Sequence, residues 1–250
     1  MQNRAIALRK LAFGVEPSNR GFRLRLARYQ AIAETLAEFL PSGPSRVLDA
    51  GCGKGRVALY WTHNRFAGKE PVFVGADISP SRMGMAAERG YAQLVRANLL
   101  EPWPFADATF DAAVLEQVIE HFDDGGVHHL LSELARVVKP GGFVIVGTPV
   151  FQRVALWLAP IWRRWKAWQL RRTNDPSPGH LQHLMVHQVV ERVEAHGLKP
   201  IRVSGVRLFS LPGALLEDSA WYYRLHRRVG ARFPGLCVEA SIVARKSAAP

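Results

Sequence analysis

The stretch RVLDAGCGKGR, residues 46–56, has the residue types and the spacing of a ligand-binding turn. Val47 and Leu48 predict a short buried strand, and three alternate glycines predict a turn that leads into an apolar helix starting near Val57. Glycine is needed where the backbone takes a positive φ or lets a ligand touch the main chain. The G-x-G-x-G spacing departs from the dinucleotide fingerprint, and Asp49 directly precedes the turn. The stretch therefore indicates a nucleotide-type site, with a purely structural turn as the alternative.

Polar residues also follow the next two predicted strands. Residues 72–77 predict a second buried strand that ends in Asp77, and residues 92–97 predict a third that delivers Asn98 and Leu99. In a doubly wound sheet, ligands bind outside the carboxyl ends of the strands, where an acid can accept hydrogen bonds from two ribose hydroxyls. An Asn side chain and the next backbone amide can present an acceptor and a donor to the edge of adenine. The alternatives are a helix cap for Asp77, although Ser79 could serve as that cap, and a simple chain turn for Asn98.

The elements that must position these residues alternate along the chain. Apolar spacing predicts a helix over 26–40, and further segments predict a fourth strand, a helix that stops at KPGG, and a fifth strand. Such alternation predicts an α/β fold, a parallel sheet with helices on both faces. We expect a single domain over 1–250, with four parts: an N-terminal cap and helix (1–40), a cofactor-binding core (45–149), a basic aromatic insert (150–180) and the C-terminal part of the sheet (181–250).

Charge and composition narrow the class of protein. The net charge is +12 and the sequence pI is about 10.4, and arginines cluster in a way that suits a polyanionic partner or, alternatively, a solvated basic face. The sequence has no apolar run of the roughly 18 residues that a spanning helix needs. Of the two cysteines, Cys52 lies inside the glycine turn, where a disulfide would obstruct the site. We therefore expect a reduced, cytoplasmic protein.

The order of five landmarks resembles the class I S-adenosylmethionine-dependent methyltransferases. The segments that carry the resemblance are VLDAGCGKG, VGADIS, ANLLEPWPFADATFD, LEQVIEHFDD and VVKPGGFVIVGTP. The chain looks most similar to the small-molecule branch that includes ubiquinone-pathway O-methyltransferases. The resemblance implies a Rossmann-like, doubly wound sheet of seven strands, mostly parallel, with the last strand antiparallel and inserted in the sheet. Residues 201–208 and 236–244 are the candidates for the two remaining strands.

The resemblance also assigns the parts of the S-adenosylmethionine site. Residues of the glycine turn would hold the methionyl part, the second strand end would take the ribose and adenine, and the third would read the adenine edge. Glycine amides at a helix start favour a carboxylate, which agrees with this assignment. The residues implied are Asp49, Gly51, Cys52 and Gly53 for the methionyl part, with Gln117 beside it, Asp77 for the ribose, Ile78 packed on adenine, and Asn98 with Leu99 at its edge.

Methyl transfer from a sulfonium is an in-line displacement, so alignment in a site without water supplies most of the catalysis. An acceptor hydroxyl or acid also needs its proton removed, and histidine suits that task. His121, after the fourth strand, and His183, which resembles a pocket histidine of related enzymes, are the candidates, with helix capping as the alternative for such histidines. Some relatives hold a divalent metal through a Glu-x-x-Glu-His set, but Gln117 occupies the first Glu position and an amide is a poor ligand for a hard cation. We therefore expect no metal.

The segment 150–173 is the most distinctive part of the sequence. Its aromatic and apolar residues recur at three- and four-residue steps with arginines between and after them. This pattern suits an interfacial helix on an anionic bilayer, a lid over an apolar acceptor pocket, an insert packed on its own domain, or an RNA-contacting surface. The residues that carry it are Trp157, Ile161, Trp165 and Trp168, with Arg163, Arg164, Lys166, Arg171 and Arg172.

The sequence as a whole predicts a methyltransferase for a small-molecule or lipid-like acceptor, located in the cytoplasm and peripherally on the inner face of the membrane. An RNA-contacting methyltransferase and a catalytically silent cofactor- or RNA-binding partner protein are the alternatives. Nucleic acid is the less favoured acceptor, since the fourth strand lacks the Asn-Pro-Pro-aromatic tetrapeptide of base N-methylating relatives. A nicotinamide-dependent oxidoreductase is disfavoured by the spacing of the glycine turn.

Overall fold

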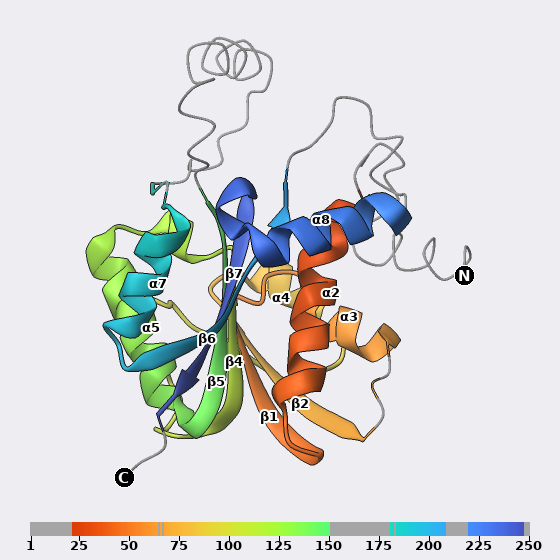
Figure 1. The fold of residues 1–250 in the computed structure, drawn as a ribbon. Helices are drawn as coiled ribbons and strands as arrows, with labels where there is room; N and C mark the ends of the chain where they lie inside the picture. The colour runs from red at the N-terminus through yellow and green to blue at the C-terminus, as the bar shows by residue number, and fades with distance from the viewer. Residues whose placement is uncertain are drawn as a thin grey trace, which may run out of the picture.

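The computed structural model describes residues 22–64, 66, 68–150, 181–182, 184–208 and 220–247. These residues form a seven-stranded sheet in the order β3-β2-β1-β4-β5-β7-β6 (Figure 1). Neighbours from β3 to β5 pair in parallel, and β7 lies antiparallel between β5 and β6. The strands are β1 (Gly43–Ala50), β2 (Lys69–Asp77), β3 (Tyr91–Arg96), β4 (Phe110–Glu116), β5 (Val138–Pro149), β6 (Leu198–Arg207) and β7 (Glu239–Lys246). The predicted Rossmann-like sheet with an inserted antiparallel strand is confirmed.

Helices cover both faces of this sheet. In Figure 1, α5 and α7 lie on one face, and α2, α3 and α8 lie on the other. The described helices are α2 (Phe22–Phe39), α3 (Arg56–Asn64), α4 (Pro80–Ala86), α5 (Asp124–Val137), α7 (Val186–Glu194) and α8 (Ala220–Arg232), with short 3₁₀ turns η1 (Ile119–His121) and η2 (Pro234–Leu236). None of these helices is long and apolar enough to cross a bilayer.

Two hydrophobic clusters, one on each face, fix the sheet between its helices. Along β1, Val47 joins the cluster formed with α2 and α3, whereas Leu48 joins the cluster formed with α5 and α7. Successive side chains of a strand point to opposite faces, so a central strand covered on both faces must be apolar at consecutive positions. This requirement explains why the sequences of the central strands are apolar runs. Because these strands are parallel, their carboxyl ends lie at one edge of the sheet.

The candidate strands 201–208 and 236–244 are shifted by a few residues to β6 and β7, and two larger differences separate the expected elements from the observed ones. β5 begins at Val138, so the KPGG segment belongs to the strand instead of preceding it. α8 lies in a stretch, 209–235, for which the sequence indicated no helix. Its inward positions explain the omission, because they include His226 and Gly230 in place of large apolar residues. A Cβ on Gly230 would lie 2.1 Å from the carbonyl oxygen of Gly205, so close backbone packing replaces an apolar stripe.

The division of the chain into parts stays a prediction. Of the predicted 150–180 insert, only Val150 falls within the described residues. Its backbone N–H donates to the carbonyl of Val238 at 3.0 Å, which ties the end of β5 to the start of β7. The chain re-enters the described region at Leu181, whose N–H donates to the carbonyl of Glu120 at 2.9 Å. The insert therefore leaves and returns at the carboxyl end of the sheet.

Candidate functional site

The glycine turn after β1 is fixed by the backbone of β2. The amides of Gly51 and Cys52 both donate to the carbonyl of Ala76, at 2.7 and 3.0 Å. All three glycines of the turn have positive φ, the region that favours glycine. A Cβ on Gly51 or Gly55 would come within 3 Å of neighbouring side chains, whereas a Cβ on Gly53 would meet nothing nearer than 3.9 Å. Gly53 therefore faces space that a ligand can use.

Asp77 joins the glycine turn to the next helix. One carboxylate oxygen accepts a hydrogen bond from the amide of Gly53 and the other accepts one from the amide of Ser79, both at 2.8 Å. The Ser79 side chain caps α4 by accepting from the amide of Arg82 at 3.4 Å, as the sequence suggested. Each carboxylate oxygen of Asp77 keeps a second lone pair. The side chain can therefore accept further hydrogen bonds from a pair of hydroxyls.

The third strand end lies against the first two. The amide of Ala97 donates to the carbonyl of Asp77 at 3.1 Å, and a Cδ atom of Leu99 lies 3.7 Å from the position of a Cβ on Gly51. Ile78 is 57% exposed, which leaves an apolar surface beside these loops. The side-chain Oδ1 of Asn98 accepts a hydrogen bond from the amide of Leu100 at 3.1 Å, so this side chain shapes the local turn. The predicted contact of Asn98 with adenine stays a prediction.

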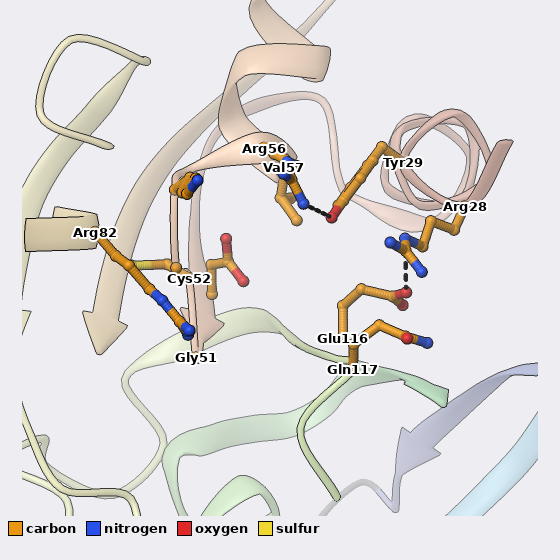
Figure 2. A pocket seen from close by; sticks show the side chains of 12 residues that line it. Arg28, Tyr29, Gly51, Cys52, Arg56, Val57, Arg82, Glu116 and Gln117 are labelled. Carbon is orange, nitrogen blue, oxygen red and sulfur yellow. Dashed lines mark hydrogen bonds and ion pairs between the residues drawn. The ribbon is translucent and has the colours of Figure 1, made fainter. Parts of the chain in front are cut away.

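A cavity of about 340 Å³ lies beside the glycine turn. Figure 2 shows the side chains that surround it, contributed by β1, the glycine turn, α2, α3, α4 and the end of β4. Five predicted cofactor residues line it: Asp49, Gly51, Cys52, Gly53 and Gln117. The sequence reasoning had not singled out the others, which are Arg28, Tyr29, Lys54, Arg56, Val57, Arg82 and Glu116. Glu116 directly precedes Gln117 in a segment that the sequence did single out, whereas Arg28 and Tyr29 carry no local signal.

Asp49 is a buried acid in the wall of this cavity, with 2% of its surface exposed. Burial raises the pKa of its carboxyl to about 7, although the Tyr91 hydroxyl donates a hydrogen bond to one of its oxygens. Burial and the nearby acids also raise the pKa of the Cys52 thiol, which keeps it neutral. A cation placed beside Asp49 would favour the ionised carboxylate. The wall is therefore suited to an ammonium group.

Gln117 combines two signs of a ligand-binding residue. Its φ is +57°, a left-handed conformation that is uncommon outside glycine, and its amide donates to the carbonyl of Gly147 at 2.8 Å. Its side-chain nitrogen is buried and has no hydrogen-bond partner among the described residues. Buried donors are rarely left without a partner. An acceptor group of a ligand in the cavity would satisfy this nitrogen, so the residues present fit an amino-acid tail.

Buried carboxyls continue from this cavity toward β7. The Nε atom of Arg28 lies 3.6 Å from a carboxylate oxygen of Glu116, and its Nη1 atom lies 3.2 Å from a carboxylate oxygen of Glu239. One guanidinium therefore pairs with two acids, and Figure 2 shows the pair with Glu116. Burial raises the pKa of Glu116 to about 8 even though Arg28 opposes the shift. Burial raises the pKa of Glu120 to about 7, and the Thr148 hydroxyl donates to it at 3.2 Å. Glu116 lines the cavity, and its raised pKa keeps its carboxyl protonated at neutral pH; Glu120 and Glu239 lie outside the described cavity wall.

The two predicted catalytic histidines are not part of the described cavity wall. His121 ends η1, is exposed, and does not belong to the residues that line the cavity. Partial burial, together with the charge of Arg82, lowers the pKa of His121, which favours the neutral imidazole at neutral pH. His183 lies outside the described residues. The described part of the chain contains no group of three or more His, Cys, Asp or Glu side chains arranged as metal ligands.

Comparisons with known proteins agree with this geometry. Residues 48–146 match the family model described as a methyltransferase domain. A tRNA (carboxymethyluridine(34)-5-O)-methyltransferase of Arabidopsis thaliana is 36% identical over 49% of this chain and 28% of its own length. A malonyl-[acyl-carrier protein] O-methyltransferase of Pseudescherichia vulneris is 35% identical over 59% of this chain and 55% of its own length. The chain therefore spans about half or less of the length of these curated relatives.

A solved structure supports the fold over a larger share of the chain. A SAM-dependent methyltransferase of Methanosarcina mazei superposes with a TM-score of 0.58 at 18% identity, covering 86% of this chain and 98% of that one. At this identity the likeness concerns the fold alone.

Proposed function

Because the chain belongs to the class I S-adenosylmethionine-dependent methyltransferase family, we propose that it transfers a methyl group to a small-molecule or lipid-like acceptor. One observation carries the proposal. Three strand-end loops meet at one edge of the sheet, where Asp77 accepts from Gly53 and from Ala97, beside a cavity walled by Asp49 and Gln117. An edge of this kind offers separate partners for the tail, the sugar and the base of one nucleoside.

The roles that we assign to the residues follow from their hydrogen-bonding capacity. The ionised Asp49 would accept from the ammonium of the methionyl tail, and the side-chain nitrogen of Gln117 would donate to its carboxylate. Asp77 would accept from the ribose hydroxyls, while Ile78 and Leu99 would pack against adenine. When bound, S-adenosylmethionine supplies an activated methyl group. The protein's contribution is then to align the acceptor with that methyl group and to exclude water.

Removal of the acceptor proton requires a base near the carboxyl end of the sheet. His121 has a lowered pKa, so its imidazole is neutral and able to take a proton at neutral pH. Glu116 has a pKa of about 8, so it holds its proton at neutral pH and is better suited to donate a hydrogen bond. We therefore retain His121 as the base, with His183 as a second candidate from the sequence alone.

The lipid-like class of acceptor and a peripheral membrane location rest on the segment 150–173. Tryptophans at helical spacing among arginines suit the interface of an anionic bilayer. A cytoplasmic protein that acts on a lipid-like acceptor would need such a contact.

An RNA-contacting methyltransferase is the second candidate. It is favoured by the 36% identity to a tRNA methyltransferase across 49% of this chain and by the net charge of +12. RNA binding of this kind is dominated by phosphate contacts and weakens steeply with salt.

The first test is calorimetric titration of the full chain with S-adenosylhomocysteine. Wild type should bind, Asp77→Ala should lose binding, and Asp107→Ala, which changes a surface carboxylate, should bind normally. Normal binding by Asp77→Ala would contradict the site. Incubation with labelled methyl donor then separates the acceptors, since label extracted into the organic phase from a lipid and metabolite extract supports the first candidate. Label retained in tRNA would support the second.

A further inference from the structure

Exposed apolar side chains recur along α8 and the turn that follows it. Of the ten large hydrophobic side chains exposed in the described residues, four lie between residues 221 and 236. They are Trp221, Leu225, Phe233 and Leu236, with exposed fractions of 54%, 41%, 51% and 44%. Singly scattered apolar residues on a surface need no explanation, but a gathered set indicates a contact surface.

The opposite side of α8 is fixed to the domain, which determines what the outer side presents. His226 is fully buried and accepts a hydrogen bond from the amide of Leu208 at 3.1 Å, and Gly230 packs against Gly205. Arg227 lies 2.9 Å from a carboxylate oxygen of Glu34 on α2. Helical geometry then places residues 221, 225, 228 and 232 on one outward stripe. We call this stripe, with Arg224, Phe233 and Leu236, the outer α8 face.

Positive charge lies among these apolar residues. Arg224, Arg228 and Arg232 are exposed on the outer α8 face, and no Asp or Glu occurs from residue 220 to residue 238. The Arg232 guanidinium lies 5.9 Å from the Phe233 ring centroid. Among the arginines of α8, Arg227 is the one that pairs with a carboxylate of the described residues. The face is therefore cationic as well as apolar.

This combination selects one occupant. Leucine and phenylalanine need an apolar phase, which a nucleic acid offers only as base faces, and aliphatic side chains gain little from stacking. Arginines beside them need anions at the boundary of that phase. An anionic bilayer supplies both, since tryptophan and arginine anchor a flat amphipathic helix at the level of the headgroups. We propose that the outer α8 face binds the surface of an anionic phospholipid bilayer.

The outer α8 face lies near elements that line the cavity. Arg28, in the wall of the cavity, bonds to Glu239, three residues beyond Leu236. In Figure 1, α8 lies beside α2, the helix that supplies Arg28 and Tyr29 to the cavity. A bilayer against α8 therefore lies on the cavity side of the sheet. The inference does not depend on the proposed methyl transfer.

Co-sedimentation of the full chain with vesicles tests the proposal. Wild type should pellet with phosphatidylcholine vesicles that contain phosphatidylglycerol and stay in solution with phosphatidylcholine alone. Arg224→Glu/Arg228→Glu should weaken the binding at least about tenfold, since each basic residue near an anionic surface strengthens the attraction to it. Leu225→Ser/Phe233→Ser should also weaken it, with no change of charge. The matched control is Lys199→Glu, an exposed lysine at the opposite end of β6, which should bind as wild type does.

Three results would overturn the proposal. Undiminished vesicle binding by both double variants, with native circular dichroism, would place any membrane contact elsewhere in the chain. Absence of vesicle binding by wild type would also overturn it. Loss of tRNA binding in the charge-reversal variant, together with unchanged vesicle binding, would assign the face to RNA instead.

Discussion

The two ends of the sheet use their carboxylates in opposite ways. At the amino end, Asp111 accepts hydrogen bonds from the amide of Arg46 at 2.8 Å and from the Lys139 ammonium at 2.6 Å. Nearby, the Lys246 ammonium donates to the carbonyl of Val138 at 2.8 Å. Both oxygens of Asp111 therefore have partners within the protein, and this end serves the fold.

At the carboxyl end, both oxygens of Asp77 also have partners, but three further acids are buried with fewer partners. Burial raises the pKa of Asp49 and Glu120 to about 7 and that of Glu116 to about 8. One oxygen of Glu120 and the side-chain nitrogen of Gln117 are buried without a hydrogen-bond partner in the described part of the chain. Buried polar groups without a hydrogen-bond partner lower the stability of the fold, and they are typical of sites that bind a ligand. The same residue types therefore stabilise the fold at one edge, and at the other edge they are left with the free hydrogen-bonding capacity that the proposed ligand site requires.

The largest expected effect comes from Gly53, in the turn after β1. Gly53→Ala should weaken S-adenosylhomocysteine binding by at least about 100-fold, or about 2.7 kcal/mol, because the added methyl group fills space meant for the ligand. Gly43→Ala, at the amino end, is the control, since Gly43 also has a positive φ and open surroundings. Both variants should lose about 1–2 kcal/mol of unfolding free energy, and calorimetry should separate them. Equal affinity of the two variants for S-adenosylhomocysteine would contradict the proposed difference between the two ends of the sheet.

The second effect concerns stability alone. Asp111→Ala should lower the unfolding free energy by about 2 kcal/mol in urea denaturation, because it removes a charged acceptor from an amide and an ammonium. Its affinity for S-adenosylhomocysteine should stay at the wild-type value. A variant that loses affinity while folded would show that the amino end also serves binding.

The third effect is the pH dependence of binding. A ligand ammonium favours the ionised Asp49, so affinity should rise with pH and level off above about pH 7, with up to about tenfold loss per unit below it. Asp49→Asn should bind more weakly and lose this pH dependence. Titrations in two buffers of different ionisation enthalpy should reveal release of a proton on binding by wild type. A flat profile for wild type would contradict the assignment.

The smallest effect is the pH dependence of stability. The pKa values of Asp49, Glu116 and Glu120 are higher in the folded state than in the unfolded state. At pH values between the two, the folded state therefore binds more protons than the unfolded state. Their contribution to stability is therefore present at low pH and is lost as pH rises from about 4 to about 8. Glu120→Gln should reduce the fall in Tm between pH 5 and pH 8, whereas the exposed Glu70→Gln should not. An equal change in both variants would point to a general charge effect.

Local sequence was sufficient to predict the part of the site that backbone and strand ends create. The glycines before α3, Asp77 at the end of β2 and Leu99 after β3 are each identified by residue type and position next to an apolar run, and they meet at one edge. Gln117 was assigned by the family resemblance alone, and it lines the same cavity. The five parallel strands were likewise predictable, because the central strands are apolar at consecutive positions, whereas the two further strands were expected from the family resemblance.

The remaining parts depend on tertiary packing, which leaves no local pattern. Arg28 and Tyr29 enter the cavity because Ile32 and Leu36 dock α2 on the sheet, and nothing in their own neighbours indicates a site. Glu239 reaches Arg28 from the far end of the chain. Helix α8 was missed since it packs through His226 and Gly230, not through an apolar stripe.

A crystal structure of the protein with S-adenosylhomocysteine tests the central claim most directly. The account predicts one nucleoside across the three loops, with its amino-acid tail beside Asp49 and Gln117, its ribose hydroxyls on Asp77, and its adenine against Ile78 and Leu99. A ligand that binds without contacting Gly53 and Asp77, or that lies away from the carboxyl end of the sheet, would contradict it.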